Sequence, residues 1–303
     1  MIDFQRPEPS RREAYNRILF AAPERGCEYS FTNLCLWGRQ RMAFLHGCVA
    51  IFSHFNGKSV YPYPIGGGDK QAVIQALMED SRERGIPLRL TGLTNGDQEE
   101  LEALFPGEFH IRTLRDTFDY VYAIDDLCDL RGRKYQKKRN HFNRFQANHP
   151  DYTVAPLDCS NLGQVQNMIN DWYITRRQSD PDGDYLLESL ALAKAFRYRE
   201  ELKLEGLALM DGGEILAVTL GSRLNETTFD IHFEKAREDV DGAYTAINCE
   251  FARHLRLKYP EVQFLNREDD LGLEGLRKAK LSYSPHHLVE KHWAYRKEDL
   301  DED

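Results

Sequence analysis

The chain has 303 residues, of which 41% are hydrophobic and 29% charged, and its formal net charge is −9. These values are typical of a globular protein with one large or two ordinary domains, and they exclude a disordered chain. The negative balance argues against a protein that coats nucleic acid through its overall field, although a local basic patch can still bind phosphates.

The six cysteines are scattered, with no Cys-x-x-Cys pair and no metal-ligand spacing. We therefore expect reduced thiols in a cytoplasmic protein, with no metal and no cofactor. No stretch approaches the roughly 20 apolar residues of a membrane span, so we expect no integral membrane segment. Contact with a membrane surface stays open.

The first 125 residues alternate between helical and strand-like patterns. Ser10 and Glu13 form a capping-box pattern, which predicts a helix that ends before Pro23. Hydrophobic periodicity predicts strands at 48–52 and 59–63, then a turn, a helix at 70–85 and a strand at 87–93, which is a β-β-turn-α-β order. It also predicts helices over 27–37 and 98–104 and a strand at 115–124. The glycines at 66–68 are typical of a structural turn, or of a loop whose NH groups face a phosphate.

A strongly basic segment follows, in which seven of the fourteen residues from Arg131 to Arg144 are Arg or Lys. Its spacing predicts a helix over about 131–145, with aromatic residues along one side and cations along the next. Two interpretations stay open. The segment is either a solvated basic helix or a surface that contacts RNA. The candidate RNA-binding residues are Arg133, Lys134, Lys137, Lys138 and Arg139.

The second half predicts helices and strands in the order helix-helix-β-β-β-α-β. The elements are a strand at 152–156, helices at 162–177 and 185–200 with a turn at 180–184 between them, a hairpin of 204–210 and 214–224 around Gly212-Gly213, a strand at 227–235, a helix at 245–258 and a strand at 261–266. This order loosely repeats that of the first half.

Polar side chains follow the last of these strands. Lys280 is the best candidate for a cation beside a reacting carbonyl, with Arg277 one helical turn earlier. Two solvated bases on a surface helix explain the same pattern. Asp269 and Asp270 are candidates for removing a proton or for binding an α-ammonium group; the alternative is that they cap a helix.

Further candidates would bind the substrate. Asn266 ends the strand, where it orients either the substrate or a turn. Asp230, His232 and Glu234 alternate onto one face of the strand at 227–235, although His232 also fits a hydrogen-bonded core position. Tyr244 is a candidate to line a pocket or to pack in the core.

Three segments carry a resemblance to a known family: the basic stretch 133–140, the hairpin 211–217 and the stretch 276–285. In the last, Lys280, Tyr283 and Pro285 match a Phe-Lys-x-x-Tyr/Phe-x-Pro pattern, with Ala279 in place of the aromatic residue. The chain resembles GNAT-type N-acyltransferases, the tandem Fem-type aminoacyltransferases and, more closely, the family of the C-terminal domain of bacterial phosphatidylglycerol lysyltransferases.

This resemblance implies an α+β fold of two tandem GNAT-like units, 1–125 and 126–303, each a mostly antiparallel sheet flanked by helices. It implies a site in the second unit that includes Tyr283, an aminoacyl-tRNA donor, and an amine, hydroxyl or lipid acceptor. The sequence differs from the lysyltransferases in having no membrane-spanning stretch.

The loop at 236–244 bears on the donor. In GNAT enzymes the matching loop is glycine-rich and basic, so that its NH groups hold the pyrophosphate of acyl-CoA. Here the loop has three acids and one glycine, which favours aminoacyl-tRNA over acyl-CoA. Three hypotheses follow: an aminoacyltransferase, an acyl-CoA-dependent N-acyltransferase, and a non-catalytic binding protein on the same fold.

Overall fold

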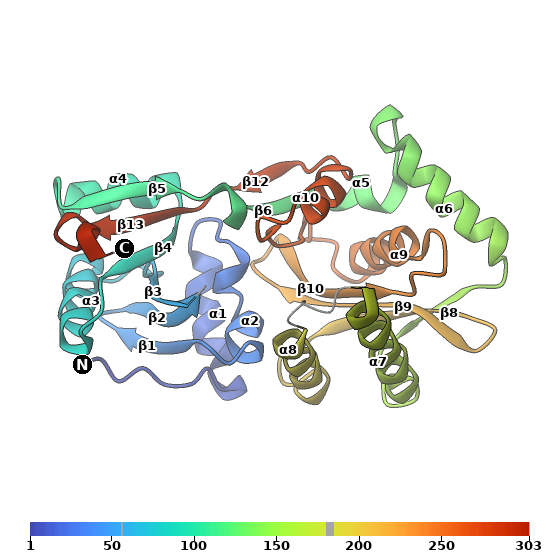
Figure 1. The fold of residues 1–303 in the computed structure, drawn as a ribbon, viewed down its shortest axis with the longest axis horizontal. Helices are drawn as coiled ribbons and strands as arrows, with labels where there is room; N and C mark the ends of the chain where they lie inside the picture. The colour runs from blue at the N-terminus through green and yellow to red at the C-terminus, as the bar shows by residue number, and fades with distance from the viewer. Residues whose placement is uncertain (56, 180–184, 303) are drawn as a thin grey trace. The chain divides into compact units, whose positions relative to one another are not determined.

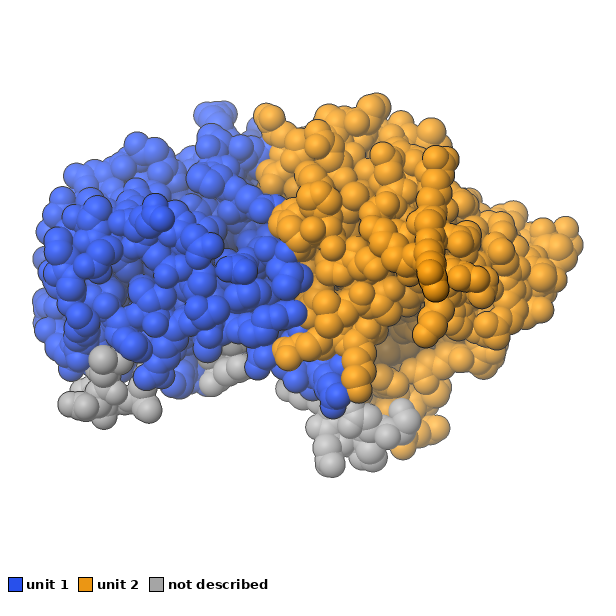
Figure 2. Space-filling model, turned by 90° about the horizontal axis from the view of Figure 1, so that it is seen from above, with its two compact units in different colours: residues 1–119, 269–274, 288–303 blue, residues 120–268, 275–287 orange. Residues whose placement is uncertain are grey.

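The computed structural model describes residues 1–55, 57–179 and 185–302. By its internal contacts the chain divides into two compact units, which Figure 2 shows in blue and orange. Unit 1 consists of residues 1–119, 269–274 and 288–303, and unit 2 of residues 120–268 and 275–287. The turn predicted at 180–184 lies outside the described residues.

The predicted boundary at 125 concerns the two GNAT-like repeats and stays a prediction. The compact units have a different make-up, because two segments from the C-terminal part of the chain, 269–274 and 288–303, belong to unit 1.

Unit 1 is built on a six-stranded sheet in the order β1-β2-β3-β4-β13-β5. β3 and β4 are parallel, and the other neighbours are antiparallel. The strands are β1 (Arg41–Leu45), β2 (Cys48–Phe55), β3 (Lys58–Pro62), β4 (Arg89–Leu93), β5 (Phe109–Thr113) and β13 (His292–Arg296). The α-helices are α1 (Arg12–Ala21), α2 (Phe31–Leu36), α3 (Lys70–Arg84) and α4 (Asn95–Leu104), and the 3₁₀ turns are η1 (Pro9–Arg11), η2 (Cys27–Tyr29), η3 (Arg115–Thr117) and η5 (Lys297–Glu302).

Local sequence signals explain where the helices α3 and α4 of this unit begin. Asp69 caps α3, since its Oδ1 accepts a hydrogen bond of 2.9 Å from the amide of Ala72. Thr94 and Asp97 form a capping box at the start of α4. α3 packs on β2 and α4 on β4. Their apolar sides join the sheet in one core.

The glycine turn before α3 has a steric explanation. A Cβ added at Gly68 would lie 2.0 Å from the carbonyl oxygen of His46, and one at Gly66 would lie 2.9 Å from the Cα of Cys48. The turn therefore packs directly on the backbone of the β1–β2 connection, where a side chain has no room.

Unit 2 is built on a sheet in the order β12-β6-β11-β10-β9-β8-β7, although Asp119 of β6 and residues 288–289 of β12 are counted with unit 1. The strands are β6 (Asp119–Ala123), β7 (Thr153–Pro156), β8 (Glu205–Asp211), β9 (Glu214–Arg223), β10 (Thr228–Ala236), β11 (Phe264–Asn266) and β12 (His287–Val289). The helices are α5 (Ile124–Asp129), α6 (Gln136–Asn148), α7 (Leu162–Ser179), α8 (Leu186–Arg197), α9 (Ala243–Lys258) and α10 (Glu274–Leu281), with the 3₁₀ turn η4 (Arg133–Tyr135) before α6. α9 covers one face of β8–β10, and α7 and α8 lie on the opposite face (Figure 1).

The predicted hairpin of unit 2 is confirmed. Asp211 pairs with Glu214, which leaves a two-residue turn. Gly212 and Gly213 occupy this turn with φ of 56° and 85°. Positive φ at both positions is what a turn matching the twist of the strands requires, and glycine adopts it without steric cost.

Three local predictions are wrong or incomplete. The Ser10 capping box does not form, because Ser10 lies in η1 and α1 begins at Arg12 without a side-chain cap. The strand predicted at 115–124 is shorter, since its first residues form η3 and β6 begins at Asp119. β5, β12 and β13 were not predicted, because each is short and pairs with strands far away in the sequence. β1 was also not predicted, although it pairs with the neighbouring β2.

Over the described ranges 1–55, 57–179 and 185–302, no helix is long and apolar enough to cross a bilayer.

Candidate active site

Two strands of unit 2 run side by side and then separate. β10 and β11 are parallel and pair over three residues, the last pair being Asp230 with Asn266. β11 ends there, whereas β10 continues to Ala236. We call this place the fork: the residues of β10 from Asp230 onward and the segment 266–268 that follows β11. Side chains at strand ends of this kind project where no further strand pairs with them.

A β-bulge lies on β10 at the fork. In its pairing with β9, Ile231 faces Gly221 and Phe233 faces Leu220, so His232 is the extra residue. A bulge changes the direction of a side chain and is common beside functional sites.

The bulge places His232 between two carboxylates, in what we call the histidine cluster: Asp230, His232 and Glu268. Nδ1 of His232 lies 3.5 Å from Oδ2 of Asp230 and 3.5 Å from Oε1 of Glu268. Its Nε2 lies 2.8 Å from Oγ of Ser222. The side chains of His232 and Asp230 are 1% and 0% exposed, whereas Glu268 is 22% exposed and so faces outward.

Glu234 belongs to a second group, the arginine cluster: Glu234, Arg267 and Tyr283. Nη2 of Arg267 donates to Oε1 of Glu234 at 2.8 Å, which joins β10 to the segment after β11. The guanidinium lies 4.8 Å from the ring centre of Tyr283. Burial works against the charge of Arg267, but Glu234 and the nearby tyrosines outweigh it and raise the pKa of Arg267. Arg267 is therefore a fixed cation.

Lys138 of α6 also reaches this cluster. Its Nζ lies 3.7 Å from the ring centre of Tyr283, on which it makes a cation–π contact. Burial, and next the charge of Arg267, lower the pKa of Lys138 to about 8. A lysine with such a pKa is partly neutral near physiological pH, and it can accept a proton. The sequence placed Lys138 among RNA-binding residues and gave no signal for this position.

Lys280 holds the backbone of the fork. Its Nζ donates to the carbonyl oxygen of Arg267 at 2.5 Å, and its own carbonyl accepts a 2.8 Å hydrogen bond from the hydroxyl of Tyr122. Arg277 lies one turn earlier on α10 and is half-buried.

Asn266, Asp269 and Asp270 have different surroundings. Asn266 is fully buried, and its Oδ1 accepts a 2.7 Å hydrogen bond from the amide of Glu268. Asp270 belongs to unit 1, where it is fully buried, lies 3.6 Å from Arg115 and accepts a 2.9 Å hydrogen bond from the amide of Gly272. Asp269 belongs to unit 1 as well and is half-buried. α10 begins only at Glu274, so neither aspartate is its cap.

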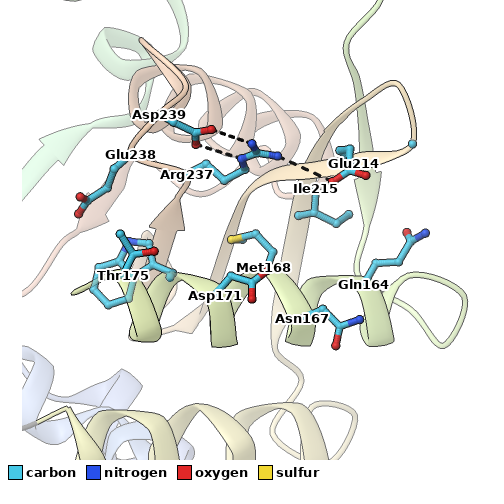
Figure 3. A pocket seen from close by; sticks show the side chains of 12 residues that line it. Gln164, Asn167, Met168, Asp171, Thr175, Glu214, Ile215, Arg237, Glu238 and Asp239 are labelled. Atoms are coloured by element: carbon cyan, nitrogen blue, oxygen red, sulfur yellow. Dashed lines mark hydrogen bonds and ion pairs between the residues drawn. The ribbon is translucent and has the colours of Figure 1, made fainter. Parts of the chain in front are cut away.

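A cleft of about 540 Å³ lies elsewhere in unit 2, between α7, the start of β9 and the loop after β10. In this cleft Arg237 is paired with Asp239 at 2.7 Å and lies 3.8 Å from Glu214 (Figure 3). Trp172 also lines it, and its Nε1 donates to the hydroxyl of Tyr244 at 3.2 Å. Tyr244 therefore lies beside this cleft.

The five predicted RNA-binding residues have different surroundings. Arg133 and Lys137 are exposed. Lys134 pairs with Asp126 at 3.0 Å. Arg139 donates to the carbonyls of Leu130 and Gly132 and so closes the turn before α6. The basic segment is thus not a uniform surface: Arg133 and Lys137 are exposed, whereas Lys138 reaches the arginine cluster and Arg139 closes a turn.

The fold class follows from the similarity of this chain to solved structures. FemX has a TM-score of 0.59 with this chain at 10% identity, and the match covers 99% of both chains. L-PGS from Bacillus licheniformis has a TM-score of 0.67 at 15% identity, over 98% of this chain and 94% of that one. The fold is thus the predicted α+β, tandem GNAT-like one.

The family follows from a sequence model. The model for the C-terminal domain of phosphatidylglycerol lysyltransferase matches residues 20–295. The chain belongs to this family, and the predicted resemblance is confirmed. Family and fold together support a protein of the general aminoacyltransferase kind.

Two relatives are more similar in sequence. A conserved protein of unknown function from Bacteroides thetaiotaomicron is 35% identical to this chain, with a TM-score of 0.91. The match covers 98% of this chain and 100% of that one. An uncharacterized protein of Mycoplasmoides gallisepticum is 25% identical over 177 residues, or 57% of this chain. The match spans only 54% of that curated relative.

The ion pair across the fork predicts a measurable coupling. Because Glu234 and Arg267 are 12% and 15% exposed, Glu234→Gln leaves a buried guanidinium poorly compensated. We expect the free energy of unfolding to fall by about 3 kcal/mol. The double variant with Arg267→Met should cost less than the sum of the single variants, with a coupling of about 2 kcal/mol in urea unfolding.

A matched control is the exposed pair of Arg237 and Asp239, 37% and 65% exposed. The cycle of Arg237→Met and Asp239→Asn should give a coupling below about 1 kcal/mol. Equal couplings in the two cycles would show that the pair at the fork has no special importance for the fold.

Proposed function

We propose that this chain is an aminoacyltransferase that moves an aminoacyl group from aminoacyl-tRNA to an amine, a hydroxyl or a lipid headgroup. The observation that carries the proposal is the convergence of Arg267, Lys138 and Lys280 at the fork, in a member of a family named for such a transfer. Cations near a reacting carbonyl stabilise the negative charge that develops on its oxygen.

The reaction needs a cation and a proton acceptor, and the fork has a candidate for each. Lys280 is the candidate cation for the carbonyl oxygen, as the sequence suggested. Lys138, with its pKa near 8, accepts the proton of the attacking group. The acceptor nitrogen or oxygen bonds to the carbonyl carbon, the bond from that carbon to the tRNA ribose oxygen breaks, and the ribose oxygen takes up a proton.

The remaining residues predicted at the site stay part of the proposal. Arg277 would add positive charge on α10. Asp269 and Asp270 stay candidates for binding an α-ammonium group or removing a proton, and they belong to unit 1. Asp270 is the weakest of these candidates, because its carboxylate is buried and used in a turn.

Acyl-CoA is a less suitable donor for a steric reason. A Cβ added at Gly242, the N-cap of α9, would lie 2.5 Å from the carbonyl oxygen of His141 and 3.0 Å from the Cβ of Phe145. α6 therefore packs against the N-terminus of α9, where a pyrophosphate would need the free NH groups.

The three acids of the same loop would repel the pyrophosphate of acyl-CoA less than their number suggests. Asp239 pairs with Arg237, Glu238 with Arg176 at 2.9 Å, and Asp241 with Arg144 at 2.8 Å. Each carboxylate is thus largely compensated by a cation. The packing of α6, more than the loop charge, disfavours acyl-CoA.

RNA contact is assigned to the exposed part of the basic segment. We expect Arg133→Ala with Lys137→Ala to weaken the binding of charged tRNA and to reduce the salt dependence by about two ion equivalents, because each cation that binds a phosphate releases one counterion. Filter binding at several salt concentrations measures both effects. The control is Arg17→Ala with Lys58→Ala, two exposed bases of unit 1.

The RNA assignment would fail if the wild-type chain showed no salt-dependent binding to tRNA. It would also fail if the two double variants behaved alike.

The pH dependence tests Lys138. Because only the neutral amine accepts a proton, the transfer rate should rise with pH and level off above about 8. Lys138→Met should remove this rise and lower the rate by about 100-fold. The assay is loss of the aminoacyl ester from charged tRNA, given amines, hydroxyl compounds and phospholipid vesicles, after subtraction of uncatalysed hydrolysis.

Lys58→Met, a change at an exposed lysine of unit 1, should keep the wild-type profile. A Lys138→Met variant with the same pH profile as wild type would remove Lys138 from the reaction. If the wild-type chain transferred the aminoacyl group to none of these acceptors, the result would favour the binding-protein alternative.

A further inference from the structure

The histidine cluster contains an imidazole nitrogen that the fold does not use. Nδ1 of His232 makes no hydrogen bond, although the side chain is 1% exposed. Buried polar atoms are rarely left in this state, because each lost hydrogen bond costs stability. The two nearest carboxylate oxygens, at 3.5 Å, lie beyond good hydrogen-bond distance.

The spacing of the three side chains suits a metal ion better. One atom from each of Asp230, His232 and Glu268 lies within 4.8 Å of the other two. The 3.5 Å from Nδ1 to each carboxylate oxygen is close to the roughly 3.4 Å edge of a tetrahedron with bonds of about 2.1 Å, the bond length of zinc to nitrogen and oxygen.

The surrounding bonds orient all three ligands. A hydrogen on Nε2 of His232 can be donated to Ser222, and this tautomer leaves the lone pair of Nδ1 directed at the carboxylates. Glu268 has a φ of +57°, which is unusual for a residue other than glycine. Its amide donates to Asn266 and its carbonyl accepts from Tyr120, so the backbone is held in this conformation.

A comparable group in unit 1 shows how such a cluster looks when a protein cation satisfies it. Cys27, Glu28 and Asp119 also lie within metal-ligand reach of one another. There, however, Nζ of Lys291 lies 2.6 Å from both Asp119 and Glu28. Burial works against the charge of Lys291, but these acids outweigh it and raise its pKa. An ammonium group thus occupies the position that an ion would take.

We propose that Asp230, His232 and Glu268 bind one divalent transition-metal ion of the Zn²⁺ class at the fork. Three protein ligands leave a fourth position, on the side of the partly exposed Glu268, for water or for an oxygen of a ligand. One imidazole with two carboxylates favours Zn²⁺ over Mg²⁺, which prefers oxygen ligands in an octahedron. The claim concerns binding and does not depend on the proposed transfer reaction.

The test is calorimetric titration of the full chain with Zn²⁺ after treatment with a chelator and removal of that chelator. We expect one saturable site per chain, affinity lowered by at least about 10-fold in Glu268→Gln, and loss of the site in His232→Ala. Glu268→Gln keeps the shape of the side chain and so remains informative if His232→Ala does not fold. Mg²⁺ should bind far more weakly than Zn²⁺.

Two control variants separate this site from others. His254→Ala removes a half-buried histidine that lies 3.5 Å from Glu205, and Cys27→Ser alters the cluster of unit 1. Both should keep the wild-type Zn²⁺ affinity. Co²⁺ bound in place of Zn²⁺ should give a spectrum without a sulfur-to-cobalt charge-transfer band, because the site contains no thiolate.

Absence of a one-to-one site in the wild-type chain would overturn the proposal. A site that is unchanged in Glu268→Gln and His232→Ala, or lost in Cys27→Ser, would overturn it as well.

Discussion

The ion pair between Glu234 and Arg267 is the interaction on which the fork depends. Beyond Asp230 and Asn266 the two strands no longer share backbone hydrogen bonds, so side chains must hold them. A guanidinium that is 15% exposed, with a carboxylate at 2.8 Å, does this at a fixed distance and in a fixed orientation. Replacing either partner with a neutral residue leaves the other as an unpaired, largely buried charge.

The family motif can be understood from this pair. Lys280 donates to the carbonyl of Arg267, and Tyr283 offers its ring to the guanidinium of Arg267 and to the ammonium of Lys138. Two residues of the motif thus converge on an arginine that the motif does not contain. Burial is the main reason why the pKa of Lys138 is low, and the charge of the neighbouring Arg267 is the next.

Local patterns predicted much of the fold. The hairpin at Gly212-Gly213, the helix after β10 and the capped helix α3 depend on residues near one another in the sequence, and all three are present. The short strand β13 depends on β4 and β5, which lie about two hundred residues earlier, and no periodicity in five residues reveals such partners. The same limit applied to the return of segments 269–274 and 288–303 to unit 1.

The candidate residues were found more easily than their surroundings. Asp230, His232 and Glu234 were recognised from alternation, but the bulge at His232 and the division into two clusters appear only in the register with β9. Counting charges alone did not reveal two features: Lys138 reaches the arginine cluster and Arg139 closes a turn within a segment that reads as a uniform basic surface, and the acids of the loop after β10 are paired. Arg267 was missed because one arginine beside three acids has no distinctive spacing.

The central claim is that an aminoacyl group is held at the fork. The most direct measurement is a crystal structure with an aminoacyl-adenosine in which an amide replaces the reactive ester. Our account predicts the aminoacyl carbonyl within hydrogen-bond distance of Lys280 or Lys138, beside Arg267. A ligand bound instead in the cleft of Trp172 and Arg237, with the fork unchanged, would contradict it.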